Sequence, residues 1–149
     1  MRLLTAKETI LILDTDQNIS WTLKTLLEHE EYPVVVVNTI ERALKNFSEF
    51  RISGVIIEYQ IEHVRTLEAI RKLKEMCPET YVMMLTDKET REDEYEEIMQ
   101  AGVDDYFLKP IPIRKILLHI QKGLRYRNVI VEKIELEREM GEKKNEKHP

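Results

Sequence analysis

Polar side chains of opposite charge follow four apolar segments of this chain, each at the carboxyl end of its segment. They are Asp14-Thr15-Asp16 after ILIL, Glu58 after GVII, Thr86 after YVMML and Lys109-Pro110 after DDYFL. Asp14 and Glu58 supply carboxylates and Lys109 supplies an ammonium group, so these ends could form ion pairs if they meet. A lysine that is removed from water, as Lys109 would be in a shared site, needs such a carboxylate as its partner.

Strand and helix patterns alternate along the chain and determine whether these ends meet. The expected strands are Thr9–Leu13, Val34–Val37, Gly54–Ile57, Tyr81–Leu85 and Asp105–Leu108. The expected helices cover about 18–30, the segment after Thr39, 66–76, 90–100 and the stretch from Ile113 to about Met140. The four valines of Val34–Val37 are typical of a strand buried on both faces. Thr39 and Gly102 are expected to cap helices.

Repeated βα alternation with continuous apolar strands predicts an α/β fold with a doubly wound parallel sheet. Right-handed crossovers leave few topologies, and five such units fit the flavodoxin-like strand order 2-1-3-4-5. In that order, ligands bind beyond the carboxyl ends of the first and third strands. Asp14 and Glu58 follow those two strands. The fold rule alone therefore predicts a site around these two carboxylates.

From Thr9 to about Lys122, the chain resembles the receiver domain of response regulators (the CheY-like module of two-component signalling). The four polar ends carry this resemblance, together with the segment AGVDDYFLKP. It implies a domain that takes a phosphoryl group onto an aspartate at the end of the third strand. Glu58 stands where the family has this acceptor, so the chain resembles an atypical receiver.

The resemblance also implies roles for residues of the last two strands. Thr86 matches the hydroxyl that hydrogen-bonds the phosphoryl group. Tyr106 matches the aromatic residue that swings inward when that threonine moves. Lys109 matches the lysine that pairs with the acceptor carboxylate, and its peptide bond to Pro110 is commonly cis in the family.

A magnesium site is implied by the resemblance in a weakened form. Asp14 matches the first acidic ligand position, Asp16 is the acidic residue that often follows, and Gln60 falls where a backbone carbonyl reaches the metal. Thr15 replaces the second carboxylate and removes one formal charge, so Mg²⁺ affinity is expected to fall. Turn formation and helix capping are the alternative roles for Asp14 and Asp16.

Glu58 leaves two interpretations open. Its additional methylene adds roughly 1.5 Å of reach and displaces the carboxylate from a site in which catalysis depends on positioning. The longer side chain either imitates the phosphorylated state in part or forms a plain ion pair with Lys109. The loop after it, residues 59–66, lacks the proline and glycines of the family, and Asp87 adds a carboxylate that would repel a phosphodonor.

These observations support three hypotheses about function. The leading one is an atypical receiver that signals by protein–protein contact with a histidine kinase or an output protein, without enzymatic activity of its own. The alternative is a working phospho-receiver with an unorthodox Mg²⁺-dependent acceptor at Asp14, Asp16 or Glu58. A third, a flavodoxin-like ligand-binding protein unrelated to receivers, is weaker because no Gly-rich phosphate loop follows the first strand.

A chain of 149 residues suffices for one domain with a sizeable core. We expect a receiver-like unit over residues 1–122 and a helical extension over 123–149, with the segment Gly141–Pro149 frayed. The helix of residues 113–140 keeps an imperfect heptad pattern. This pattern favours a homodimer through a short coiled coil, with a linker to an output domain as the alternative.

Composition excludes several classes of function. The formal net charge of −5 leaves no basic footprint for direct nucleic-acid binding, and no apolar segment approaches the roughly 20 residues needed to span a membrane. The single cysteine, Cys77, cannot form an internal disulfide, which favours the cytoplasm. Trp21, beside Ile19 on the first helix, is expected to pack rather than to serve as a binding platform.

Overall fold

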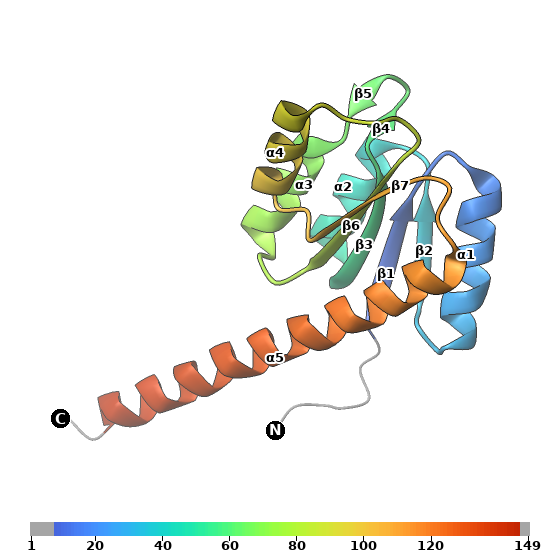
Figure 1. Ribbon diagram of the computed structural model, residues 1–149. Coiled ribbons are helices and arrows are strands. Elements are labelled where there is room, and N and C mark those ends of the chain that lie inside the picture. Colours follow the sequence, from blue (N-terminus) through green and yellow to red (C-terminus); the bar gives the residue numbers. More distant parts are fainter. Residues whose placement is uncertain (1–7, 147–149) are drawn as a thin grey trace.

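The computed structural model describes the backbone of residues 8–146, which forms a five-stranded parallel sheet flanked by helices (Figure 1). The sheet has the order β2-β1-β3-β6-β7, with strands β1 (Thr9–Leu13), β2 (Val34–Val37), β3 (Ile52–Glu58), β6 (Tyr81–Thr86) and β7 (Asp105–Leu108). The remaining strands, β4 (Gln60–Ile61) and β5 (Val64–Arg65), form a separate antiparallel hairpin. The predicted order 2-1-3-4-5 is therefore confirmed, with β6 and β7 as its fourth and fifth strands.

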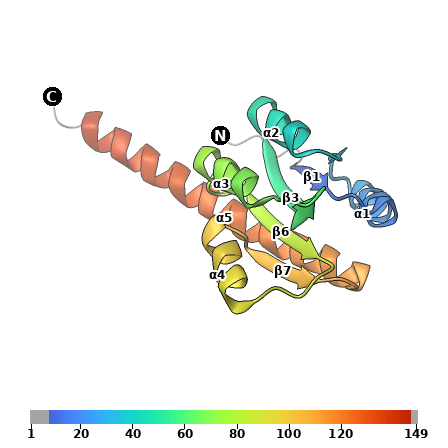
Figure 2. The ribbon, with the colours of Figure 1, turned by 90° about the horizontal axis from the view of Figure 1, so that it is seen from above.

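The helices cover both faces of the sheet, as Figure 2 shows from above. They are α1 (Gln17–His29), α2 (Ile40–Glu49), α3 (Leu67–Met76), α4 (Glu92–Ala101) and α5 (Ile113–Glu146). Alternate residues of each strand point to opposite faces. Ile10 and Ile12 of β1 pack with α1 and α5, whereas Leu11 and Leu13 pack in the other core with α2, α3 and α4. Both cores are apolar, which fixes the strand register.

Local sequence accounts for where several helices begin and end. Asp16 accepts hydrogen bonds from the N–H groups of Asn18 and Ile19 and so caps α1. The predicted caps are also present: Thr39 accepts from the N–H of Arg42, and Gly102 ends α4 in the left-handed conformation with φ 114°. These caps place the loops that follow the strands at one edge of the sheet.

The interpretation of Val34–Val37 as a strand buried on both faces is wrong. It forms β2 at the edge of the sheet, and Val36 is 40% exposed. Its register lies beside β1 alone, from Ile10 with Val34 to Leu13 with Val37. The expected packing of Trp21 is also wrong: this side chain is 71% exposed because Leu23 and Leu27 supply the buried face of α1.

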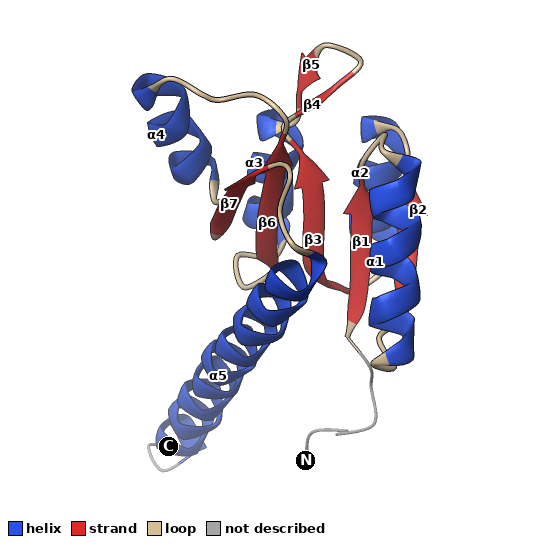
Figure 3. Ribbon diagram, turned by 45° about the vertical axis from the view of Figure 1, so that its right-hand side comes forward, coloured by secondary structure: helices blue, strands red, loops and turns tan. Residues whose placement is uncertain are grey.

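After Glu58 the sequence indicated only a loop that lacks proline and glycine. In the structure this segment forms the hairpin β4–β5. Its two turn residues, Glu62 and His63, both have positive φ (50° and 66°), which non-glycine residues adopt rarely. Figure 3 shows the hairpin beyond the carboxyl-end edge of the sheet. The first residue of the hairpin, Gln60, lies two residues after Glu58.

Helix α5 packs its first half against the sheet and continues past it (Figures 1 and 3). Leu124, Arg127 and Val131 are buried, so packing continues beyond residue 122. The predicted fraying from Gly141 is wrong up to Glu146, which is still helical; one glycine costs about 1 kcal/mol, too little to end a helix. Residues 147–149 of that prediction lie outside the described part. Within residues 8–146, no helix is long and apolar enough to cross a membrane.

Candidate functional site

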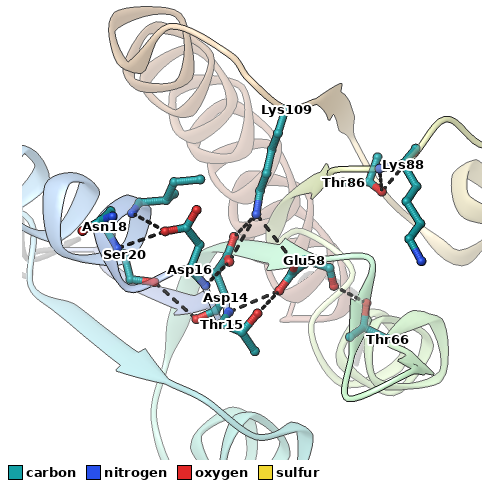
Figure 4. Close-up of polar contacts among 11 residues, drawn as sticks. Asp14, Thr15, Asp16, Asn18, Ser20, Glu58, Thr66, Thr86, Lys88 and Lys109 are labelled. Carbon is teal, nitrogen blue, oxygen red and sulfur yellow. Dashed lines mark hydrogen bonds and ion pairs between the residues drawn. The ribbon is translucent and has the colours of Figure 1, made fainter.

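The residues singled out by their types lie together at the carboxyl-end edge of the sheet (Figure 4). Asp14 directly follows β1, and Glu58 and Thr86 are the last residues of β3 and β6. Lys109 follows β7 and reaches across the edge of the sheet toward Asp14 and Glu58. Because the strands are parallel, their carboxyl ends lie at the same edge of the sheet, and this arrangement brings the four residues together.

Lys109 forms a buried ion cluster with the two carboxylates. Its Nζ lies 3.0 Å from Oδ2 and 3.3 Å from Oδ1 of Asp14, and 3.7 Å from Oε1 of Glu58. The side chain of Asp14 is fully buried, and those of Lys109 and Glu58 are only 11% and 12% exposed. Lys109 is therefore bound more closely to Asp14 than to Glu58, and the expected Glu58–Lys109 contact is the longer of the two.

Burial raises the pKa of the Asp14 carboxyl, because desolvation disfavours its charged form. The N–H of Asp16 donates a hydrogen bond of 2.8 Å to Oδ1 of Asp14, and Lys109 adds its positive charge; both oppose that rise in pKa. Oδ2 accepts no hydrogen bond of good geometry, so the ammonium group of Lys109 is what balances it. Asp14 is thus a buried carboxylate whose ionisation depends on Lys109.

Thr15 and Glu58 contact each other directly. The Thr15 hydroxyl donates a hydrogen bond of 2.9 Å to Oε2 of Glu58, and the Thr15 N–H donates a second one of 3.2 Å to the same oxygen. Figure 4 shows Glu58 turned toward the loop after β1. The sequence did not predict this contact, because it depends on where the longer side chain of Glu58 comes to rest.

Through its side chain, Thr86 makes only local hydrogen bonds in the described part of the chain. It is 2% exposed, and its hydroxyl donates to the carbonyl of Lys88 (3.1 Å) and accepts from the N–H of the same residue (3.2 Å). Its carbonyl accepts a hydrogen bond of 2.7 Å from the N–H of Lys109. Among the described residues, no hydrogen bond joins the Thr86 hydroxyl to Glu58.

The segment from Thr90 to Pro110 places the remaining candidates. The hydroxyl groups of Tyr106 and Thr90 lie 2.9 Å apart, and the ring of Tyr95 meets that of Tyr106 edge-on at 5.6 Å between centroids. The bond between Lys109 and Pro110 is cis. Tyr106 is thus held between the loop that follows Thr86 and helix α4.

The possible metal ligands are already engaged in other contacts. Asp16 caps α1, Asp14 pairs with Lys109, and the Thr15 hydroxyl donates to Glu58. Gln60 lies in β4, where it pairs with Arg65. Over the described residues, no group of three or more His, Cys, Asp or Glu side chains is arranged to hold a metal ion.

Two contacts that the sequence did not indicate tie the chain after Glu58, including the hairpin, to α4. Both guanidinium N–H groups of Arg65 donate to Glu97 at 2.8 Å, and the Tyr59 hydroxyl donates to Glu94 at 3.1 Å. The signal was weak because Glu62-His63 is not a typical two-residue turn, which favours Asn-Gly or Asp-Gly. The chain after Glu58 is therefore fastened to α4.

Comparison with known proteins gives one consistent family. A family model described as the response regulator receiver domain matches residues 10–121. The uncharacterized transcriptional regulatory protein YkoG of Bacillus subtilis is 28% identical over 125 residues, which cover 84% of this chain and 54% of that protein. The response regulator ArlR of Staphylococcus saprophyticus is 28% identical over 122 residues, covering 78% and 52%. The chain spans about half the length of these curated relatives.

Solved structures show the same fold. A CheY-like response regulator receiver domain protein from Methanospirillum hungatei matches with a TM-score of 0.77 and 24% identity, over 83% of this chain and 98% of that one. A response regulator receiver domain protein from Clostridium thermocellum matches with a TM-score of 0.72 and 22% identity, over 83% and 98%. At these identities the likeness supports the architecture alone.

Proposed function

Because the chain belongs to the response regulator receiver domain family, we propose that it is an atypical receiver of two-component signalling in which Glu58 holds the acceptor position and phosphoryl transfer has been lost. Signalling then proceeds through protein–protein contact. Receiver modules of this family generally act without enzymatic activity. The proposal is that this chain keeps the scaffold and its contacts, while its site is permanently occupied by its own side chains.

The contact between Thr15 and Glu58 carries this proposal. Two departures from the family pattern, a threonine for a carboxylate and a glutamate for an aspartate, meet in two hydrogen bonds to one oxygen. Lys109 stands 3.7 Å from the other oxygen of Glu58. Of the groups that the resemblance assigns to an incoming phosphoryl group, Lys109 therefore lies beside the Glu58 carboxylate, whereas the Thr86 hydroxyl bonds to Lys88.

The donor set does not fit a resident Mg²⁺ ion, although receiver domains typically bind one. Mg²⁺ prefers several freely placed oxygen ligands in octahedral geometry. Here Asp14 is neutralised by Lys109 at 3.0 Å, and Asp16 accepts two backbone N–H groups at the start of α1. We therefore propose that signalling needs no Mg²⁺ and that Gln60 does not serve as a metal ligand.

The test is the intact mass after incubation with acetyl phosphate and Mg²⁺. The natural chain is expected to gain no phosphoryl group. The Glu58→Asp variant should gain one, and Glu58→Asp combined with Thr15→Asp should gain it faster, because this pair restores a shorter nucleophile and the second carboxylate. Thr15→Asp alone serves as the matched control and should stay unmodified.

A phosphoryl group on the natural chain would contradict the proposal and support the alternative, a working receiver with Asp14, Asp16 or Glu58 as acceptor. That alternative draws on the retained Lys109 and Thr86 at the same edge of the sheet. Failure of both Glu58→Asp variants to react, while they remain folded, would instead contradict the claim that Glu58 and Thr15 are what blocks the chemistry.

We place the contact surface for a partner on α4, β7 and α5. Tyr95 of α4 and Leu108 of β7 are 44% and 42% exposed, and with Tyr106 they line a hollow of about 430 Å³. Glu89 and Glu92 lie at the same hollow. A histidine kinase or an output protein is the proposed partner, in the cytoplasm, without direct contact to nucleic acid or membrane.

We also propose that residues 123–149 form an extension of the 1–122 unit and that the helix of residues 113–140 supports a homodimer. Tyr126, Val129, Leu136 and Met140 are each at least 59% exposed. Their successive separations of three, seven and four residues place them on one stripe of a coiled-coil heptad. This stripe faces away from the sheet, because the buried Leu124 and Val131 lie on the opposite side of the helix.

Sedimentation equilibrium of the chain should therefore give a dimer mass at high concentration and dissociation on dilution. Leu136→Glu should shift the equilibrium to monomer by inserting a charge in the apolar stripe. The control Glu135→Lys, also a charge change but off the stripe, should dimerise like the natural chain. A monomer mass at every concentration would contradict the dimer.

A further inference from the structure

A cavity of about 740 Å³ lies beside the ion cluster, between α1, the end of β2 and the first turn of α2. This volume falls within the range of small-molecule pockets. Asp14 and Asn38, which directly follow β1 and β2, line the cavity, so it lies at the carboxyl-end edge of the sheet, where α/β folds place their ligands. Asp14 of the ion cluster lines this cavity, as does Thr15, whose hydroxyl donates to Glu58.

The exposed Trp21 lines this cavity although it contributes little to the core. Its side chain is 71% exposed, and the neighbouring Val36 of the edge strand is 40% exposed. An indole that is open to solvent is a stacking surface for aromatic rings, and every nucleobase offers such a ring. The aromatic part of a ligand therefore has a place in the cavity.

Three carboxamide side chains line the same cavity: Gln17, Asn18 and Asn38. All three residues are exposed, and across the described residues none of their side chains makes a hydrogen bond to the protein. A carboxamide offers one donor and one acceptor side by side, which complements the N6 and N7 positions of adenine. The lining is therefore suited to recognise a purine edge.

Two cations complete the lining. Lys24 lies one turn after Trp21 and is paired with Glu28 at 2.9 Å. Arg42 of α2 is exposed, and no ion pair to it is present in residues 8–146. A free guanidinium matches phosphate oxygens in a bidentate geometry. Two carboxylates also line the cavity: Asp14, which Lys109 neutralises, and Glu62 at the hairpin turn.

We propose that this cavity binds a purine nucleoside monophosphate, with the base stacked on Trp21 and its phosphate on Arg42. The ligand would touch Thr15, whose hydroxyl holds Glu58. Binding of the ligand would therefore act on the same edge of the sheet at which a phosphoryl group would otherwise act. Binding itself does not depend on whether Glu58 can be phosphorylated. A negative result in the phosphorylation test would therefore leave the binding proposal intact, and a negative binding result would leave the proposed function intact.

Trp21 is the only tryptophan of the chain, so its fluorescence reports this cavity specifically. Trp21 is excited at a wavelength that adenosine 5′-monophosphate does not absorb. Addition of this nucleotide should then quench the emission along a saturable curve. Inorganic phosphate should leave the emission unchanged, and adenosine should bind more weakly than the nucleotide. Arg42→Gln should weaken nucleotide binding about tenfold, the effect of one lost hydrogen bond between charged groups.

Lys45→Gln is the matched control, since it removes the same charge from α2 outside the cavity lining and should leave the affinity unchanged. Calorimetry with Trp21→Leu should show no heat of binding, provided that circular dichroism shows a folded chain. A quench that rises linearly without saturation, or that is equal in the Arg42→Gln and Lys45→Gln variants, would overturn the proposal. Equal affinity for adenosine and its monophosphate would overturn it as well.

Discussion

Replacing Lys109 with methionine is expected to lower the free energy of unfolding by about 3 kcal/mol at neutral pH, because it leaves a buried carboxylate without its counter-ion. Asp14 has no exposed side-chain surface, and its Oδ2 is balanced by Lys109 at 3.0 Å. Methionine keeps most of the length of lysine, so packing changes little. Urea denaturation of both proteins measures the difference.

The effect of Lys109→Met should depend on pH in a defined direction. The pKa of Asp14 is raised above its ordinary 3.8 in the folded protein, so the folded state holds this proton more tightly than the unfolded chain does. Its contribution to stability is therefore largest below about pH 3.8 and is lost as the pH rises through the folded pKa. Removing Lys109 raises that pKa further, so the deficit should shrink as the pH falls from neutrality toward the folded pKa.

Lys72→Met is the control, because Lys72 is exposed on α3 and its side chain forms no ion pair within the described residues. It should change the stability by less than about 0.5 kcal/mol at any of these pH values. A deficit for Lys109→Met that equals the control, or that grows as the pH falls, would show that Asp14 does not depend on Lys109.

Two glycines of α5 are expected to respond to alanine with opposite signs. A Cβ on Gly123 would lie 2.3 Å from the ring of Tyr81, whereas one on Gly141 would meet nothing within 4 Å. The Tyr81 ring cannot retreat easily: the residue is 5% exposed, and its hydroxyl donates a hydrogen bond of 2.6 Å to Asp105. Gly123 therefore packs directly against the ring of Tyr81 and leaves no room there for a side chain.

Gly123→Ala should destabilise the fold by about 1–3 kcal/mol through overpacking. Gly141→Ala should stabilise it by about 0.5–1 kcal/mol, because alanine is the better helix former where nothing crowds it. Thermal unfolding of the two variants beside the natural chain gives both signs in one experiment. Two changes of the same sign would mean that the helix does not lie as closely on Tyr81 as described.

The strands and their order could be predicted from the sequence because each strand is a short apolar segment that ends in polar residues. For the same reason the meeting of Asp14, Glu58 and Lys109 could be foreseen, since parallel strands bring their ends together. The cis bond before Pro110 also agrees with what the family resemblance implied. These features depend on pattern and spacing alone.

Other features depend on where individual side chains come to rest, which spacing does not determine. Glu58 lies within hydrogen-bonding reach of Thr15 and at 3.7 Å from Lys109, although charge alone favoured the lysine. Trp21 was expected inside, but α1 fills its buried face with leucines. The hairpin was missed because its turn uses Glu62 and His63 instead of the usual turn residues, and its contacts to Glu94 and Glu97 join segments more than thirty residues apart.

Helix α5 packs against the body over only part of its length, so a small movement at the body becomes a larger one at its far end. It is fixed to the body as far as Val131, and the 15 residues from there to Glu146 run on as a continuous rod, about 22 Å long at 1.5 Å per residue. A tilt of about 10° at Val131, where the packing against the body ends, then displaces the far end by roughly 4 Å, given that length. A change too small to alter the packing of the sheet is thereby magnified at the far end of the helix, as in a lever turning about Val131.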